Sequence, residues 1–130
     1  MSLAAVGLFA FGLTGSAVVQ QTSMNDHLVG SWTFVSAVAE GPSGDKSEPF
    51  GPNPNGIIIF ARDGHFSLFQ SRPELPRIAA NDRSKATAGE AKAIVQSVIA
   101  YYGTYSLNEA DKVISVKIEA STFPNVAGPN

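Results

Sequence analysis

Few side chains in this sequence can carry out acid–base or metal chemistry. The chain has only two histidines, His27 and His65, and no cysteine. The absence of cysteine excludes disulfides, thiolate catalysis and cysteine-based zinc sites. The two histidines lie far apart in the sequence, so a metal site would need carboxylates that only the fold can bring to them. We therefore predict neither a metal nor a cofactor.

One short motif resembles a nucleophilic site. Asp63 and His65 are followed by Ser67, the residue types of a hydrolase triad. A triad is defined by geometry rather than by spacing, and Asp63 with Gly64 forms a strong turn signal between two β-rich segments. We interpret the motif as the tip of a hairpin. The segment 44–47 (GDKS) lacks both the residue order and the following helix of a phosphate-binding loop.

The aromatic side chains are more informative. Their usual role is to form a core, but a small β-barrel has just enough interior for side chains or one small ligand, so some aromatics must line any cavity. Tyr105, His65 and Arg72 would supply the few polar groups that orient a ligand in an apolar pocket. The predicted ligand-binding residues are Trp32, Phe34, Phe50, His65, Phe66, Leu68, Arg72, Tyr105 and Phe123.

The composition favours an apolar ligand over nucleic acid. Hydrophobic residues make up 44% of the chain and charged residues 15%, compared with a usual charged share of about 25%. The net charge is -2, and no run of lysine or arginine provides the basic surface that nucleic-acid binding requires. We expect some apolar surface to be used for binding.

The first part of the chain has the pattern of a targeting segment. Residues 3–13 are nearly all apolar, no charge occurs before Asp26, and small residues follow at 14–17. We interpret residues 1–21 as a signal peptide, which predicts a periplasmic or secreted protein. The alternatives are a membrane anchor, although the apolar stretch is just short of the roughly 20 residues that a spanning helix needs, and a buried segment of the domain itself.

The remaining chain predicts mostly strands. Residues 28–39 are rich in β-branched and aromatic types. Residues 56–61 and 65–71 flank Asp63 and Gly64, which predicts a hairpin with a two-residue turn, Ala61 opposite Phe66, and Ile59 opposite Leu68. Both faces of this hairpin are apolar, so we expect both to be covered. Residues 104–107 and 112–120 form a second predicted hairpin whose last strand has one solvated face.

Two loops and one helix connect these strands. Residues 40–55 contain four prolines and three glycines among sixteen residues, which predicts a long loop or lid that carries Phe50. Residues 72–86 are interpreted as a polar connection. A capping box from Thr87 to Glu90 starts a helix whose apolar positions continue to Tyr102, with Gly103 as its C-cap. Residues 28–130 are predicted to form one domain.

The order of several short motifs carries a family resemblance. Gly30-Ser31-Trp32 matches the G-x-W motif of lipocalins, and the motifs LVGSW, EPFGPNPNGIIIF, DGHFS, SRP, AYYGTYSL and FPN follow one another between Leu28 and Asn125. Together they resemble the bacterial lipocalin-like domain family. The resemblance implies an antiparallel β-barrel with an internal cavity, a short helix outside it or across one end, and a tryptophan at the closed end.

Two departures from this family pattern affect the predicted barrel. Family members usually continue beyond FPN through further strands, and lipocalins have a basic residue near the last strand that stacks on the tryptophan. Neither feature follows FPN in this sequence. We therefore expect an all-β, antiparallel lipocalin-like barrel with one α-helix, C-terminally truncated and incompletely closed.

The function expected from the sequence is non-catalytic binding of a small hydrophobic molecule in the barrel cavity. One alternative is an isomerase or cyclase that uses the same cavity, with Tyr105 or His65 as proton donor. A structural or partner-binding envelope protein is the other. Five predicted strands fall short of the roughly eight that close a small barrel, so we also expect homo-oligomers that form through the N-terminal segment or open strand edges.

Overall fold

The computed structural model describes residues 23–128. Its main feature is a five-stranded antiparallel sheet in the order β1-β4-β5-β6-β7. The strands are β1 (Gly30–Thr33), β4 (Asn55–Phe60), β5 (His65–Ser71), β6 (Val98–Asn108) and β7 (Val113–Ser121). The last four form a meander in which each strand pairs with the next along the chain. This arrangement confirms the predicted all-β antiparallel class.

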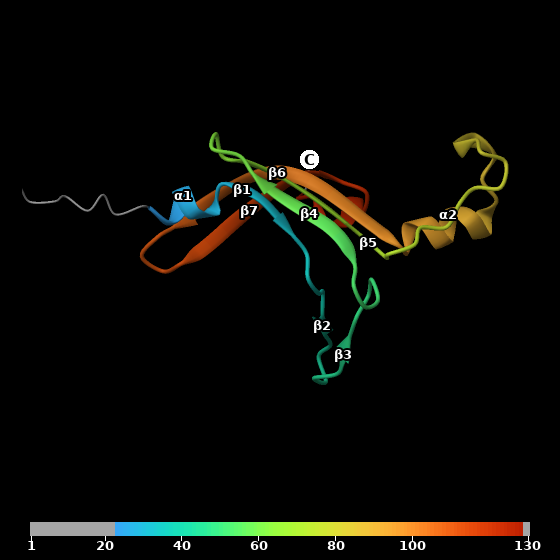
Figure 1. Cartoon of the computed structure of the whole chain (residues 1–130), viewed down its shortest axis with the longest axis horizontal. Helices are drawn as coiled ribbons and strands as arrows, with labels where there is room; N and C mark the ends of the chain where they lie inside the picture. Colours follow the sequence, from blue (N-terminus) through green and yellow to red (C-terminus); the bar gives the residue numbers. More distant parts are fainter. Residues whose placement is uncertain (1–22, 129–130) are drawn as a thin grey trace, which may run out of the picture.

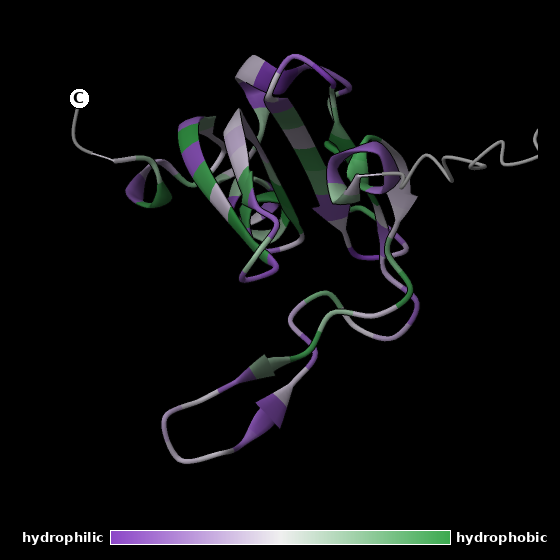
Figure 2. Ribbon diagram, turned by 90° about the vertical axis from the view of Figure 1, so that its left-hand side faces the viewer, coloured by the Kyte–Doolittle hydropathy of each residue, from purple (hydrophilic) through white to green (hydrophobic). Residues whose placement is uncertain are grey.

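The sheet is curved but open. Seen roughly along its strands, it bends like part of a barrel wall (Figure 2). Strands β1 and β7 are its two edges, and within residues 23–128 no strand pairing joins them. The part of the chain that the structure describes thus forms the curved sheet of a barrel without closing it.

Smaller elements lie at the ends of the sheet. Figure 1 shows α1 and α2 at opposite ends, with the two-stranded β2–β3 sheet projecting away from it. Among residues 23–128 no helix is long and apolar enough to cross a membrane. The bounds are α1 (Met24–Leu28), β2 (Ala39–Glu40), β3 (Lys46–Ser47), α2 (Ala88–Val95) and two 3-10 helices, η2 (Arg83–Lys85) and η3 (Pro124–Val126).

The predicted strand over residues 28–39 is wrong in its extent. Its first residue belongs to α1, where the Ser23 hydroxyl accepts a hydrogen bond from the backbone N–H of Asp26 at 3.2 Å. After β1, the N–H of Phe34 still donates to the carbonyl of Gly56 at 3.2 Å. Pro54 then precedes β4, and proline has no N–H with which to continue the ladder.

The hairpin between β4 and β5 is confirmed, but its predicted register is wrong by one residue. Phe60 pairs with Phe66, at the position that a two-residue turn assigns to Ala61. Side chains alternate between faces along a strand, so a shift of one residue moves every β4 side chain to the other face. Phe60 therefore shares a face with Phe66 and Leu68, and Ile59 lies on the opposite face.

The structure of the loop explains this register. The N–H of Ala61 donates to the carbonyl of His65 at 2.8 Å, and the N–H of Gly64 donates to the carbonyl of Ala61 at 3.2 Å. Gly64 has a φ of 92°. A tight turn followed by a left-handed glycine is the usual three-residue hairpin loop. The loop thus has one residue more than the predicted turn.

The predicted helix from Thr87 to Tyr102 begins correctly and ends too late. The capping box is present: the Thr87 hydroxyl accepts from the N–H of Glu90 at 3.2 Å, and the Glu90 carboxylate accepts from the N–H of Thr87 at 2.8 Å. The helix α2 ends at Val95, and β6 starts at Val98. The apolar residues after Val95 fit both the helical and the strand periodicity, so their spacing predicted a longer helix. Pairing with β5 makes them a strand.

The segment 40–55, predicted as a loop, contains parts of the short β2–β3 hairpin, in which Glu40 pairs with Lys46. The predicted signal peptide, residues 1–21, lies outside the described residues.

Candidate functional site

The curved sheet has one face with a continuous apolar lining, which we call the inner face. Phe60, Phe66 and Leu68 are buried on it, although no helix of the described chain forms a second layer over these strands. Curvature explains this burial, because side chains on the concave side converge. By strand register, the inner face consists of Trp32, Ile58, Phe60, Phe66, Leu68, Gln70, Ile99, Tyr101, Tyr105, Ile114, Val116 and Ile118.

Four aromatic rings form a connected cluster on the inner face. Phe60 lies 6.3 Å from Phe66 and 5.0 Å from Tyr105 between ring centroids, and Phe66 lies 6.0 Å from Tyr101. Two of these contacts are edge-to-face, a geometry that aromatic quadrupoles favour. The cluster links three neighbouring strands and provides a rigid apolar surface.

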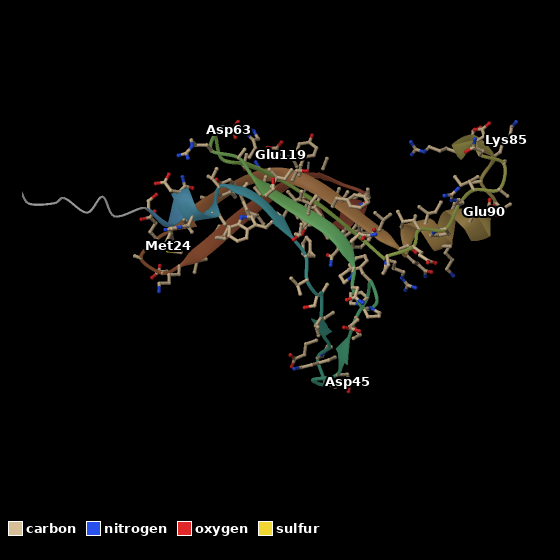
Figure 3. All side chains as sticks on the ribbon, in the orientation of Figure 1. Met24, Asp45, Asp63, Lys85, Glu90 and Glu119 are labelled. Atoms are coloured by element: carbon tan, nitrogen blue, oxygen red, sulfur yellow. The ribbon has the colours of Figure 1, made fainter. Side chains whose placement is uncertain are left out.

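Toward α1, two polar side-chain atoms of the inner face donate hydrogen bonds to backbone carbonyls. The indole Nε1 of Trp32 donates to the carbonyl of Leu28, the last residue of α1, at 2.8 Å. The Tyr105 hydroxyl donates to the carbonyl of Ala61 in the β4–β5 loop at 2.7 Å. Figure 3 shows Met24 of α1 and the loop residue Asp63 at this same end.

An ion pair at the same end ties α1 to the β4–β5 loop. The Arg62 guanidinium lies 3.0 Å from the Asp26 carboxylate, and both side chains are substantially exposed. The hydrogen bond from Arg62 lowers the pKa of Asp26 below its usual value. Exposed pairs of this kind contribute little to stability.

The opposite end of the sheet, near α2, is lined by other aromatic residues. Phe50 and Phe123 meet there around a cavity of about 200 Å³ that Ile99 and Thr122 also line. Phe34 lies beside Gly56 of β4: its backbone N–H donates to the Gly56 carbonyl, and its ring lies against Gly56. A Cβ atom placed on Gly56 would be 2.6 Å from Phe34 Cδ2. Phe50 and Phe123, far apart in the sequence, thus come together.

Of the three predicted polar residues, the structure brings Tyr105 together with the aromatic ones, but not His65 or Arg72. His65 pairs with Thr104 on the other face, and its Nδ1 lies 3.1 Å from the Asp63 carboxylate. The hydrogen bond from the backbone N–H of His65 is the main cause that lowers the pKa of Asp63, and the hydrogen bond from the His65 side chain is the second. Arg72 follows β5 and is exposed. Tyr105 is on the inner face, but its proton is engaged by a backbone carbonyl.

Comparison of the sequence with known families decides how this sheet is to be classified. Residues 29–130 match the sequence model of the family described as a lipocalin-like domain. The chain belongs to the lipocalin-like domain family. Searches of curated proteins and of solved structures found no match.

The fold places several of the predicted site residues on the inner face. Trp32 of the Gly30-Ser31-Trp32 motif lies on the inner face, and its indole Nε1 donates to the carbonyl of Leu28 in α1. Among the other predicted site residues, Phe66, Leu68 and Tyr105 also lie on the inner face.

The predicted site omits three aromatic or polar residues of the inner face, besides several aliphatic ones. Phe60 and Tyr101 belong to the aromatic cluster, and Gln70 is a buried polar residue between them and α2. The wrong hairpin register placed Phe60 on the other face, and the overlong helix removed Tyr101 from the sheet. A glycine such as Gly64 readily adopts the left-handed conformation of a three-residue loop. That loop length gives the register in which Phe60 shares a face with Phe66.

The opposite face of the lipocalin-like sheet, which we call the outer face, is also apolar. Ile57, Ile59, Phe69 and Tyr102 are exposed on it, so the prediction that both faces are covered is wrong for residues 23–128. Two shallow hollows of about 400 and 350 Å³ lie along Ser67 and Tyr102. Exposed apolar patches of this kind often serve in interactions.

Metal ligation has no structural basis in the described region. Residues 23–128 contain no cluster of three or more histidine or acidic side chains that could hold a metal ion. The chemistry that this site offers is apolar contact with a few hydrogen bonds.

Proposed function

We propose that the inner face of this lipocalin-like sheet binds a small hydrophobic molecule without chemically changing it. The observation that carries the proposal is the connected aromatic cluster of Phe60, Phe66, Tyr101 and Tyr105 on a concave face with no charged side chain among its members. Ligand sites are typically concave and apolar, with a small number of polar groups that fix orientation. Family membership supports this reading.

The geometry favours binding over an isomerase or cyclase reaction. A general acid must lie within hydrogen-bond reach of the reacting group. His65 lies on the outer face, and the Tyr105 proton is held by the carbonyl of Ala61 at 2.7 Å. The two proton donors considered from the sequence therefore do not meet on the surface that we propose for the ligand.

An uncharged apolar fluorophore tests this proposal directly. We expect N-phenyl-1-naphthylamine to bind the chain and to be displaced by fatty or aromatic compounds. Leu68→Trp fills the inner face and should abolish probe binding, whereas Phe69→Trp, one residue along on the outer face, should leave it intact. Circular dichroism confirms that both variants are folded. No probe binding, or binding that survives Leu68→Trp in a folded protein, would contradict the proposal.

We also propose that the protein acts in the periplasm or is secreted. The support is the sequence pattern of residues 1–21, an apolar run followed by small residues. Expression in a bacterial host with fractionation tests this expectation. A processed protein in the periplasm or medium is the expected result, and unprocessed protein confined to the cytoplasm would oppose it.

The outer face supports a second candidate, a partner-binding role. Its exposed residues Ile57, Ile59 and Phe69 form an apolar patch that nothing in the described chain covers. Ile59→Lys tests this role, because a charge on the patch should weaken partner or self-association without affecting probe binding. Unchanged association in this variant would leave the patch without a role.

A further inference from the structure

Gln70 is a polar side chain buried where the rest of the site is apolar. It lies on β5 with 7% of its surface exposed, opposite Gly56 on β4 and Ile99 on β6. Its amide Nε2 is fully buried and has no hydrogen-bond partner among residues 23–128. A buried donor without a partner destabilises a fold, so its presence calls for a function.

The neighbours of Gln70 are the residues that line the end of the inner face near α2. On one side, the Phe34 ring fills the space above Gly56, whose missing Cβ would lie 2.6 Å from that ring. On the other side, Ile99 lines the cavity of about 200 Å³ that Phe50 and Phe123 also line. Gln70 is thus the strand neighbour of Ile99, and Ile99 lines this cavity together with other apolar and aromatic residues and the polar Gln96 and Thr122.

Gln70 also marks a direction along the inner face. Leu68 and Phe66 follow it on the same face of β5; Trp32 lies in the row of Leu68, and Tyr105 lies beyond Phe66. The Trp32 Nε1 and the Tyr105 hydroxyl already donate to backbone carbonyls. The amide of Gln70 is a buried donor without a partner on this face, at the end away from α1.

We propose that the Gln70 amide is the specificity-determining hydrogen-bond donor of the binding site, an inference that rests on the proposed function. The ligand is then an apolar molecule with a carbonyl or carboxyl oxygen near one end. That oxygen accepts a hydrogen bond from Nε2, and the apolar part lies along Leu68 and Phe66. The Phe34 ring, in the segment between β1 and β2, moves aside to admit it.

The full chain and three ligands of equal carbon-chain length test this inference. Methyl laurate, lauric acid and dodecane compete with N-phenyl-1-naphthylamine for the wild type and for Gln70→Met. We expect the wild type to prefer the two oxygen-bearing ligands. Gln70→Met should weaken their binding roughly tenfold and change dodecane binding by less than about twofold. It should also raise the melting temperature of the free protein, because the unpaired amide is removed.

The outcomes separate this inference from the proposed function. If all three ligands displace the probe and their relative affinities are the same in wild type and Gln70→Met, the function stands and Gln70 is not the anchor. If no ligand displaces the probe, the proposed function fails. A better affinity for the ester than for the acid identifies a neutral carbonyl as the preferred group, and the reverse identifies a carboxylate; both support the anchor.

If Gln70→Met does not fold, a measurement on the unmutated chain tests the same inference. The side-chain ¹⁵N–¹H signals of Gln70 should shift when methyl laurate is added and should remain unshifted by dodecane. Equal shifts with both ligands, or none with either bound, would overturn the assignment of Gln70 as donor.

Discussion

Gly103 shows how a single residue fixes the geometry of this sheet. It is buried in β6 opposite Phe66, at a register shift between β6 and β7. A Cβ atom at this position would overlap the backbone carbonyl of Lys117. Irregularities of this kind increase the local twist and bend of a strand pair. Glycine thus allows β7 to approach closely where the sheet curves.

We predict that Gly103→Ala destabilises the fold by about 1–3 kcal/mol, the usual cost of overpacking a close contact. Gly89→Ala is the control, because Gly89 lies in α2 with nothing within 4 Å of the added Cβ. That change should stabilise by roughly 0.5–1 kcal/mol. Urea unfolding measures both. Equal effects of the two substitutions would show that the close approach at Gly103 is unimportant.

At the scale of elements, Glu90 organises the segment that leads into α2. Its carboxylate accepts hydrogen bonds from the backbone N–H groups of Ala79 at 2.9 Å and Thr87 at 2.8 Å. Both hydrogen bonds lower the pKa of Glu90, and the bond from Ala79 has the larger effect. The ionised Glu90 carboxylate therefore contributes its full stabilisation of the folded state above the pKa of an unfolded glutamate. This contribution is lost as the pH falls through the lower pKa that Glu90 has in the folded state.

The two hydrogen bonds to Glu90 predict the pH response of the backbone amides that donate them. The NMR signals of the Ala79 and Thr87 amides should titrate together, with a midpoint below that of glutamate in an unstructured peptide. Glu90→Gln should abolish the titration. A midpoint equal to the peptide value would mean that the two hydrogen bonds do not persist in solution.

Elements differ in how far their sequences determine them. The capping box at Thr87 and the turn at Gly64 are local signals; the capping box was predicted correctly, and the turn was located but predicted one residue too short. The end of α2 and the extent of β6 depend on pairing with β5, a long-range contact that local spacing does not contain. The inner-face residues show the same division, because Trp32 was named from its motif, whereas Phe60, whose face depends on strand register, was not named.

At the scale of the whole molecule, the two sheet edges are the main unsatisfied feature. Strand β7 is largely exposed, and its outward-facing backbone groups have no strand partner among the described residues. Open edges with apolar side chains recruit other strands. We therefore expect the chain to associate, either with a second copy through β7 or through residues 1–21 of the same or a neighbouring chain.

Light scattering of the chain with and without residues 1–21 tests this expectation. Association or loss of the cooperative melt after the deletion would support it, because either shows that an open edge needs cover. A well-dispersed monomer that retains the full melt after the deletion, with rapidly exchanging edge amides in β7, would show that the edges need no further strand.

Two valines of β7 test most directly whether the ligand binds on the inner face. Val116 lies on the inner face opposite Tyr105, and Val113 lies on the outer face opposite Asn108. They match in residue type, in strand and in exposure, at 51% and 50%. A carboxylate within an apolar site is strongly unfavourable, so the two aspartate variants should differ in binding alone.

The deciding measurement is the affinity of N-phenyl-1-naphthylamine for Val116→Asp and for Val113→Asp, both folded by circular dichroism. We predict that Val116→Asp weakens binding by about tenfold or more, which corresponds to about 1.4 kcal/mol or more, and that Val113→Asp changes it by less than about twofold. Equal losses in the two variants, or a greater loss in Val113→Asp, would contradict binding on the inner face.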